Sequence, residues 1–296
     1  MATQIITVLC EGPHDVAFIT KILKTTGFKS DEGTKLSKYP SPINQLLTKE
    51  VTKTNIGELN LQTARKVFLP SKALKRGNIH IFLYEMGGDS KILSNSPPLL
   101  REFISFIPKE EGGLTVLPSG TELSLLYFLD ADDKGILKRI EELNKVIYEN
   151  FKEEPFKKHT DFPVFNGIKL GAFVFTGSDN NTGKLEDILI PLMTEDNESI
   201  FQEAESYLSK HFKEERLFPL KLSINHEGKM YEERSKVDKL TYYTLKSRIG
   251  VVGQLQKSGS NNVVCIGQTD YLTLEKIQSN GKCQEIIAFF EEFISK

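Results

Sequence analysis

Cysteine is scarce in this chain, and the cysteines that occur form no recognisable pattern. The 296 residues contain only Cys10, Cys265 and Cys283, and no two of them have the CxxC spacing. Three scattered cysteines are too few for a disulfide framework and lack the arrangement of a structural zinc site. The sequence therefore favours a protein of a reducing compartment.

Long apolar runs are also missing. No stretch reaches the roughly 18 apolar residues that a membrane-spanning helix needs, and residues 1–10 have no basic segment ahead of their apolar residues. The apolar run stops at Glu11-Gly12, which is typical of a strand followed by a turn and not of a signal peptide. We expect a cytoplasmic protein without a membrane partner.

An excess of positive charge is absent as well. The formal net charge is −2, with 38 basic against 40 acidic residues. A protein that binds nucleic acid through its whole-molecule field is usually basic. Any contact with DNA or RNA must therefore come from a local basic patch.

What remains is an ordinary globular composition, with 39% apolar and 26% charged residues. The length allows one large domain or two modest ones. The pattern begins with a buried strand at 4–10, a turn, and an amphipathic helix at 15–24. Further strands are predicted at 79–84, 125–129 and 171–175, and helices at about 98–107 and 136–148. This alternation predicts an α/β fold with a parallel sheet flanked by helices.

The C-terminal part is predicted to be mostly helical. Helical patterns occur at about 184–193, 198–213, 235–251 and 283–295, and residues 263–266 form a short strand or a buried link. No linker rich in Pro, Gly or Ser divides the chain. We predict a core at 1–180 with a basic insertion at about 29–78, and a helical extension at 181–296 packed on that core. A homo-oligomer is compatible with this organisation.

Acidic residues follow three of the predicted strands. They are Glu11, Glu85 with Asp89, and Asp130 with Asp132. In open α/β sheets, ligands bind at the carboxyl ends of the strands, and in an extended segment Asp130 and Asp132 would lie on the same side. Oxygen ligands without His or Cys suit Mg²⁺ or Mn²⁺. The alternative is a solvated turn that caps the following helix.

Two of these motifs resemble the Toprim domain. Residues 8–19, Val-Leu-Cys-Glu-Gly-Pro-His-Asp-Val-Ala-Phe-Ile, are similar to its opening motif, a hydrophobic strand that ends in Glu-Gly. Residues 125–132 are similar to its later motif, a hydrophobic strand that ends in DxD. Toprim domains occur in type IA and type II topoisomerases, DnaG-type primases, OLD-family nucleases and the RecR recombination mediator. The resemblance implies that Glu11, Asp130 and Asp132 hold Mg²⁺ or Mn²⁺ and form the catalytic site.

A later segment adds to this resemblance. Residues 183–189 resemble a G-x-LED segment of small bacterial Toprim-related proteins. By analogy with OLD-type nucleases, Glu186 or Asp187 would serve a second metal ion. The alternative is that both acids lie in the first turn of a helix, where the helix dipole favours them. The insertion between Glu11 and Asp130 makes their spacing longer than in compact Toprim domains.

Other residues near these motifs are candidates for binding phosphate. Gly12, Gly87 and Gly88 follow strands, where backbone N–H groups hold phosphates, and Gly87-Gly88 resembles the glycine turn between the Toprim motifs. Lys91 and Lys134 are placed to stabilise negative charge on a phosphate. Turn glycines and solvated surface lysines are the alternative interpretations.

The predicted insertion supplies the local basic patch. Residues 49–76 contain seven basic and two acidic residues, and Arg65, Lys66, Lys75 and Arg76 are the candidates for nucleic-acid binding. A solvated face is the alternative interpretation of such a stretch.

Together these patterns predict a Mg²⁺-dependent nuclease or phosphodiesterase that acts on DNA or RNA. Glu11 would be either a metal ligand or the general acid or base. One alternative is a Toprim protein that binds nucleic acid or a partner without cutting, as RecR-type proteins do. Another is a nucleotide-handling α/β protein with a metal-assisted phosphate site.

Overall fold

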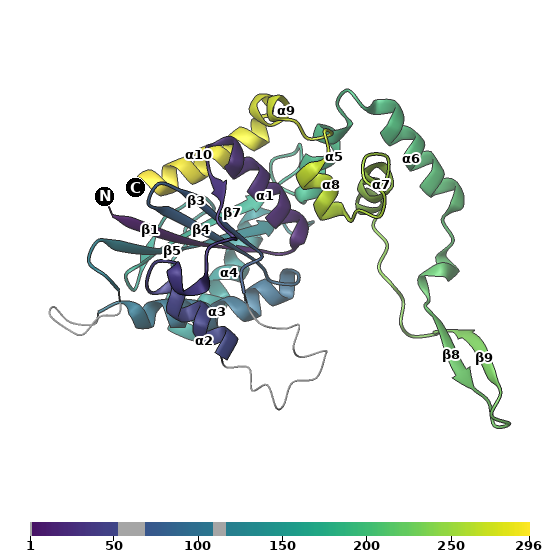
Figure 1. Cartoon of the computed structure of the whole chain (residues 1–296), viewed down its shortest axis with the longest axis horizontal. Helices are drawn as coiled ribbons and strands as arrows, with labels where there is room; N and C mark the ends of the chain where they lie inside the picture. The colour runs from purple at the N-terminus through teal and green to yellow at the C-terminus, as the bar shows by residue number, and fades with distance from the viewer. Residues whose placement is uncertain (1, 53–68, 109–116) are drawn as a thin grey trace. The chain divides into compact units, whose positions relative to one another are not determined.

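The computed structural model describes residues 2–52, 69–108 and 117–296 (Figure 1). The chain forms two compact units, of which the first combines Met1–Ile188 with Thr273–Lys296 and the second is Leu189–Leu272. The predicted α/β class is confirmed, because the first unit contains a mostly parallel sheet flanked by helices and the C-terminal part is largely helical. Within the described ranges, no helix is long and apolar enough to cross a membrane.

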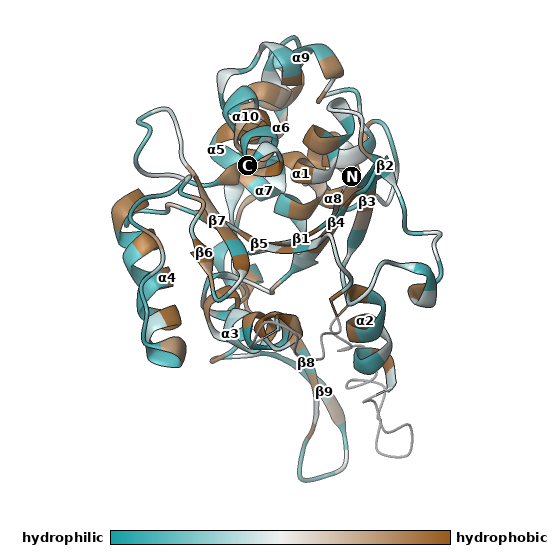
Figure 2. Cartoon of the chain, turned by 90° about the vertical axis from the view of Figure 1, so that its left-hand side faces the viewer, coloured by the Kyte–Doolittle hydropathy of each residue, from teal (hydrophilic) through white to brown (hydrophobic). Residues whose placement is uncertain are grey.

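The central sheet has seven strands in the order β2-β3-β4-β1-β5-β7-β6. Its four middle strands are parallel to one another: β4 (Ile79–Glu85), β1 (Thr3–Cys10), β5 (Thr121–Asp130) and β7 (Ile168–Phe175). Three short strands extend it in antiparallel fashion: β3 (Lys72–Arg76), β2 (Lys29–Ser30) and β6 (Val164–Phe165). The middle strands have continuous apolar sequences because helices cover both faces of the sheet. Much of the sheet is coloured as hydrophobic in Figure 2.

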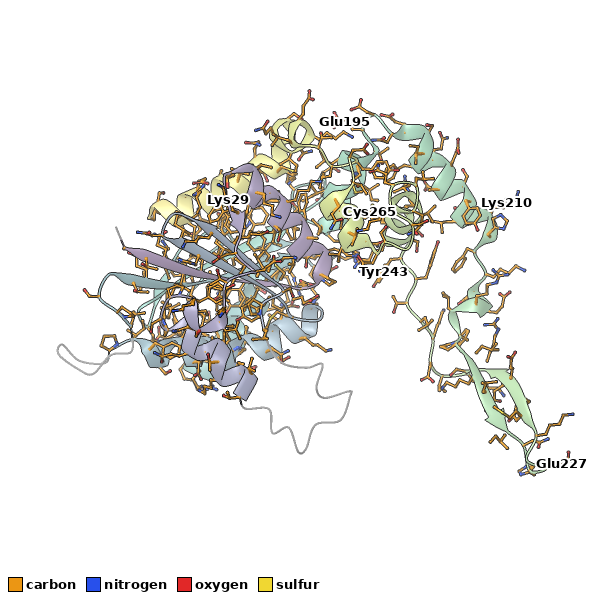
Figure 3. All side chains as sticks on the ribbon, in the orientation of Figure 1. Lys29, Glu195, Lys210, Glu227, Tyr243 and Cys265 are labelled. Atoms are coloured by element: carbon orange, nitrogen blue, oxygen red, sulfur yellow. The ribbon has the colours of Figure 1, made fainter. Side chains whose placement is uncertain are left out.

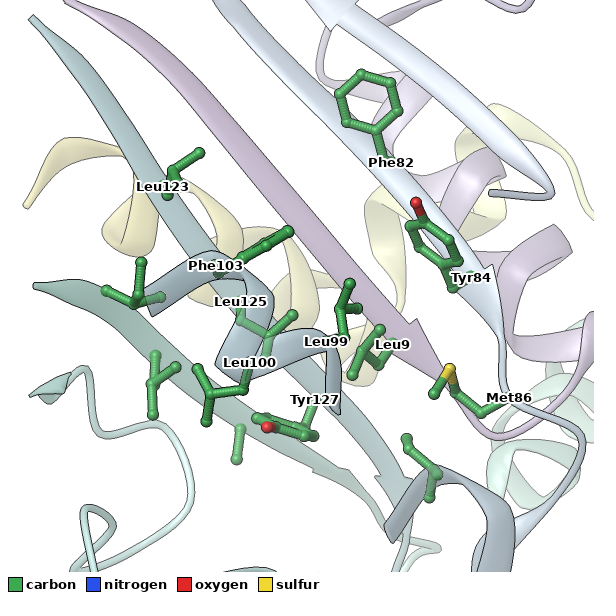
Figure 4. Close-up of a cluster of buried hydrophobic side chains, with 14 of the residues drawn as sticks. Leu9, Phe82, Tyr84, Met86, Leu99, Leu100, Phe103, Leu123, Leu125 and Tyr127 are labelled. Atoms are coloured by element: carbon green, nitrogen blue, oxygen red, sulfur yellow. The ribbon is translucent and has the colours of Figure 1, made fainter. Parts of the chain in front are cut away.

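Helices cover both faces of this sheet (Figure 1). One layer consists of α1 (Pro13–Thr25) and α10 (Gly281–Ser295), and Phe128 of β5 stacks on Phe290 of α10 with ring centroids 5.3 Å apart. The opposite layer consists of α2 (Ile43–Thr52), α3 (Asp89–Phe106) and α4 (Ile136–Phe151). Figure 4 shows part of the hydrophobic core between the sheet and this opposite layer, where Leu100 and Phe103 lie beside Leu125 and Tyr127. Each fully buried side chain of this kind contributes about 1.5–3 kcal/mol.

The second unit combines helices with a hairpin. α5 (Leu185–Thr194) leads into it, and α6 (Glu198–His211), α7 (Thr244–Gly253) and α8 (Asn262–Gln268) form its helical part. Phe201 and Tyr271 meet edge to face there, with centroids 5.5 Å apart. A 3₁₀ turn (Glu214–Leu217) precedes the hairpin of β8 (Leu220–Ile224) and β9 (Met230–Arg234). Figure 3 labels Glu227 at the tip of this hairpin, whose side chains are largely exposed.

The division of the chain differs from the predicted one. The boundary expected at residue 180 falls close to Ile188, but residues 273–296 belong to the first unit and not to a separate extension. They include the short helix α9 (Leu274–Ser279) and α10. The physical reason is the aromatic face of α10, because Phe289, Phe290 and Phe293 are buried against the sheet.

Two local predictions also change, and one element was not predicted. Residues 263–266 lie in α8 and not in a strand, since the Asn261 side chain accepts the N–H of Val264 at 3.0 Å and caps the helix. The hairpin at 220–234 was not expected. α3 begins at Asp89 and not near residue 98, and it continues through Pro97 and Pro98, which usually mark the start of a helix.

Part of the segment predicted as an insertion, residues 29–78, belongs to the central sheet. Residues 53–68, which include Arg65 and Lys66, lie outside the described residues. Within the remainder, a 3₁₀ turn (Leu36–Lys38) and α2 precede β3, and β2 and β3 add two strands to the sheet. The basic composition of β3, Lys-Ala-Leu-Lys-Arg, hid its strand character. β3 lies next to the edge strand β2, which pairs only with its Leu74 and Lys75, and strands near an open edge tolerate charged residues.

Candidate functional site

Glu11 and Asp130 meet at the carboxyl edge of the sheet. Glu11 directly follows β1 and Asp130 is the last residue of the neighbouring β5. One carboxylate oxygen of Glu11, Oε1, accepts the backbone N–H of Asp130 at 2.9 Å. The fold therefore brings together two residues that lie 119 positions apart in the sequence. Glu85, at the end of β4, does not join them: it is exposed and accepts the Ser71 hydroxyl at 2.7 Å.

Arg139 of α4 holds Glu11 in place. Its guanidinium side chain is fully buried and donates from Nη2 to Glu11 Oε1 at 2.7 Å. Nη1 lies 2.6 Å from Asp89 Oδ1 and 2.9 Å from Glu142 Oε2. Burial raises the pKa of Glu11, and the N–H of Asp130 and the charge of Arg139 partly offset that rise.

Sequence reasoning missed Arg139, although a signal was present. The apolar stripe of α4 includes Ile136, Ile140 and Leu143, and Arg139 lies on this stripe, three residues after Ile136 and four before Leu143. A charged residue on a buried helix face requires a charged partner. The pattern thus predicts a buried ion pair, without saying which acid completes it.

Asp130 lies in a crowded group of carboxylates. Its Oδ1 accepts the N–H of Leu185, the first residue of α5, at 2.8 Å. Burial, followed by the charges of Asp15, Glu11 and Glu186, raises the pKa of Asp130 to about 9. Asp15 was not singled out from the sequence; it is buried in the first turn of α1 and accepts the Gly12 N–H at 2.7 Å.

Asp132 has a different geometry from the predicted one. Its φ of 47° is in the left-handed region, so the extended conformation of β5 does not continue through Asp132. The chain turns there because Asp132 and Gly183 exchange two backbone hydrogen bonds of 2.7 and 2.9 Å. The Asp132 carboxylate forms an ion pair with Lys184 at 3.1 Å, and its charge contributes to raising the pKa of Glu11.

The predicted phosphate-binding glycines position Glu11. The N–H groups of Gly87 and Gly88 donate to the Glu11 carbonyl at 3.1 and 2.7 Å. Both glycines have positive φ, 89° and 114°, as expected for glycine turns. Gly12 has φ −146°, which any residue adopts, and it is the N-cap of α1. A role for these three glycines in binding phosphate stays a prediction.

The candidate lysines and acids around the site have partners of their own. Lys134 pairs with Glu142 at 3.0 Å and lies 3.5 Å from Asp89, while Lys91 is an exposed residue in the first turn of α3. Glu186 is almost fully buried, and its Oε1 lies 3.1 Å from Nδ1 of His14. Asp187 accepts the N–H of Lys184 at 2.8 Å. A second-metal role for Glu186 stays a prediction.

Comparisons with known proteins leave this site without a named counterpart. No family model matches the chain, and no curated protein matches it. Among solved structures, the chain is similar to the hypothetical protein PH0156 from Pyrococcus horikoshii OT3, with a TM-score of 0.49 and 17% sequence identity over 98% of this chain and 95% of that one. A similarity at this level carries no argument about fold or function.

The described members of the predicted basic patch lie at the other end of the sheet. Lys75 pairs with His80 and Arg76 with Ile79, at the start of β4, whereas the acidic residues follow its end. Lys75 is exposed. Arg76 makes a two-pronged ion pair with Glu291 of α10, at 2.6 and 2.9 Å, and stacks on Phe28. Nucleic-acid binding by Lys75 and Arg76 stays a prediction, and it would not occur beside the carboxylates.

A cavity of about 420 Å³ lies between α2 and α3, away from the carboxylates. It has an apolar floor with two acids, and it is lined by Leu46, Glu50, Tyr84, Asn95, Pro98, Leu99 and Glu102. The carboxylate group at the strand ends therefore does not line this cavity.

The carboxylate group fits a hard cation with few protein ligands. Within residues 2–52, 69–108 and 117–296, no three His, Cys, Asp or Glu side chains are grouped so as to hold a metal ion. Glu11 and Asp130 each engage one carboxylate oxygen in the hydrogen bonds described above. Mg²⁺ keeps several waters and commonly binds through one or two carboxylates and a substrate phosphate. A Mg²⁺ or Mn²⁺ site formed by these acids stays a prediction.

We predict that removing the charge of Asp130 stabilises the protein at high pH. The pKa of Asp130, about 9, exceeds the roughly 3.9 of an unstructured aspartate. The bound proton therefore stabilises the fold fully below about pH 4, and this contribution is lost as the pH rises towards 9. Asp130→Asn keeps an oxygen for the Leu185 N–H. In EDTA, the unfolding free energy of Asp130→Asn minus that of wild type should increase by at least about 1.4 kcal/mol between pH 5 and pH 9. This amount corresponds to one pKa unit.

Thermal and urea unfolding at several pH values measure this difference. Asp133→Asn is the matched control, since it makes the same chemical change at an exposed position of the same turn. Equal pH dependence for Asp130→Asn and wild type would contradict the raised pKa.

Proposed function

We propose that this protein is a Toprim-type phosphodiesterase that uses Mg²⁺ or Mn²⁺ to cut DNA or RNA. The observation that carries the proposal is the crowding of Glu11, Asp15, Asp130 and Glu186 at the carboxyl edge of the sheet, where the pKa of Asp130 is raised to about 9. Such a group is fully ionised at neutral pH only when a cation joins it. The Toprim-like motifs around Glu11 and Asp130 support the same conclusion.

Each residue has a distinct part in this proposal. Glu11 and Asp130 would hold the ion, and Asp132 would join them when its ion pair with Lys184 opens. When bound, the ion supplies a Lewis acid that polarises the phosphate and lowers the pKa of a bound water. Arg139 fixes the Glu11 carboxylate, because it donates to Oε1 and leaves Oε2 for another partner. Lys134 is the exposed cation closest in sequence to the DxD motif and would meet the phosphate.

A non-catalytic protein that binds nucleic acid or a partner, as RecR-type proteins do, is the second candidate. One specific observation favours it: Arg139 and Lys184 already neutralise Glu11 and Asp132 within the chain. In this candidate Asp130 keeps its proton at neutral pH, so the carboxylate group persists without a metal ion.

A cleavage assay separates the two candidates. Plasmid DNA, linear DNA and RNA are incubated with the protein in Mg²⁺, in Mn²⁺ and in EDTA. We expect cleavage of at least one substrate with metal and none in EDTA, and a loss on the order of a hundredfold or more for Asp130→Asn. Asp133→Asn, in the same turn, should cleave like wild type. Binding without cleavage under every condition would support the second candidate.

A further inference from the structure

His14 and Glu186 form a pair at the edge of the carboxylate group. His14 is the second residue of α1 and Glu186 the second residue of α5, so both side chains come from the first turns of helices that begin at the carboxyl edge of the sheet. His14 Nδ1 lies 3.1 Å from Glu186 Oε1. The Glu186 side chain is 4% exposed and that of His14 is 16% exposed. Only the fold joins them, since 172 positions separate them in the sequence.

The helix dipoles do not account for the histidine of this pair. A helix N-terminus favours negative charge, so a histidine in the first turn gains nothing from the helix dipole. The negative charge of Glu186 is favoured in the first turn of α5 without a histidine beside it. The ionised carboxylate accepts a hydrogen bond from the Nδ1–H of the neutral ring, which assigns the tautomer whose Nε2 carries the lone pair. Nε2 is the remaining polar atom of this ring, and 16% of the side chain is exposed.

We propose that His14 is the general base of the phosphodiesterase and that Glu186 is its positioning residue. This inference rests on the proposed function. Nε2 takes a proton from the attacking water while the water oxygen forms a bond to phosphorus and the bond to the leaving oxygen breaks. The leaving oxygen gains a proton from solvent, and His14 returns its own proton to solvent, so no oxidant or reductant is involved. Glu186 stabilises the positive ring that forms in between.

The position of the pair fits this step. Glu186 lies close enough to Asp130 for its charge to raise the pKa of that acid, and His14 follows Glu11 by three residues at the same strand end. Glu11 is less suited to be the base, because its Oε1 already accepts from Arg139 and from the Asp130 backbone. In this proposal the carboxylates hold the ion and His14 moves the proton.

Chemical rescue tests the proposal. His14→Ala, His14→Gln, Glu186→Gln and the control His226→Ala are assayed on plasmid DNA, linear DNA and RNA with Mg²⁺, with and without added imidazole. We expect His14→Ala to lose on the order of a hundredfold or more in rate, and imidazole to restore part of it. His14→Gln keeps the contact with Glu186 but fills the space, so it should be inactive and not rescued. Glu186→Gln should show a smaller loss, and His226→Ala, at an exposed position of the hairpin, none.

The outcomes are distinct. Rescue of His14→Ala by imidazole, with Mn²⁺ affinity and unfolding temperature like those of wild type, supports the proposal. Wild-type cleavage that persists in both His14 variants overturns it and leaves the proposed function standing. Loss of activity without rescue in folded His14→Ala also overturns it. Absence of cleavage by the wild-type protein overturns the proposed function itself.

Discussion

Glu11→Gln is expected to lower cleavage by on the order of a hundredfold or more while nucleic-acid binding is kept. Glutamine retains an oxygen that accepts the Asp130 N–H and the Arg139 guanidinium, so the shape of the site persists. It removes the negative charge that would hold the ion. Binding of nucleic acid should equal or exceed that of wild type, because one charge that repels phosphate is gone. Cleavage rates and binding isotherms on the same substrate measure both effects.

Glu85→Gln is the matched control for this change. Glu85 ends the adjacent strand β4, level with Cys10, but it is exposed and bonded to Ser71. It should cleave like wild type. Undiminished cleavage by Glu11→Gln would place the active site elsewhere, and equal losses in both variants would indicate a general charge effect.

Arg139→Met is expected to cost about 3–5 kcal/mol of unfolding free energy. Breaking a buried ion pair leaves an uncompensated charge, which is the origin of a penalty of this size. Arg139 has no exposed side-chain surface and contacts Glu11, Asp89 and Glu142. Its removal leaves the buried Glu11 without its cation, whereas Lys134 stays close to Asp89 and Glu142. Urea unfolding measures the loss, and activity should fall with it because Glu11 is no longer fixed.

Lys138→Met, one position earlier on the same helix, is the control. Lys138 pairs with Glu141 on the surface, where such pairs contribute about 0–1 kcal/mol. Adding Glu11→Gln to Arg139→Met should make the combined loss smaller than the sum of the single losses, because the two residues share one interaction. A loss for Arg139→Met no larger than that for Lys138→Met would show that the buried network does not stabilise the fold.

The sequence predicted the parallel core because buried parallel strands are continuous apolar runs. Residues 79–84, 125–129 and 171–175 have this character, and each lies within an observed strand. The basic strand β3 and the polar hairpin at 220–234 do not have it, and neither was predicted. α10 was expected as a helix, but its membership of the first unit depends on aromatic packing that no local pattern reveals.

The proximity of the acids that follow neighbouring parallel strands could be predicted from the sequence. The meeting of Glu11 and Asp130 follows from strands of one parallel sheet, each ending in an acid. Three features depend on tertiary contacts: the buried Arg139, the left-handed turn at Asp132 fixed by Gly183, and the pairing of His14 with Glu186. Each joins residues of different elements, so their side chains become partners only in the folded chain.

Calorimetric titration of Mn²⁺ into the protein at pH 7, in two buffers of different ionisation enthalpy, tests the central claim most directly. Asp130 is the group expected to carry a proton at that pH, because burial and its acidic neighbours raise its pKa to about 9. Binding of the ion should therefore release on the order of one proton, and Asp130→Asn should bind Mn²⁺ more weakly and release none. Absence of Mn²⁺ binding to wild type, or binding and proton release unchanged in Asp130→Asn, would contradict a metal site at the carboxyl edge of this sheet.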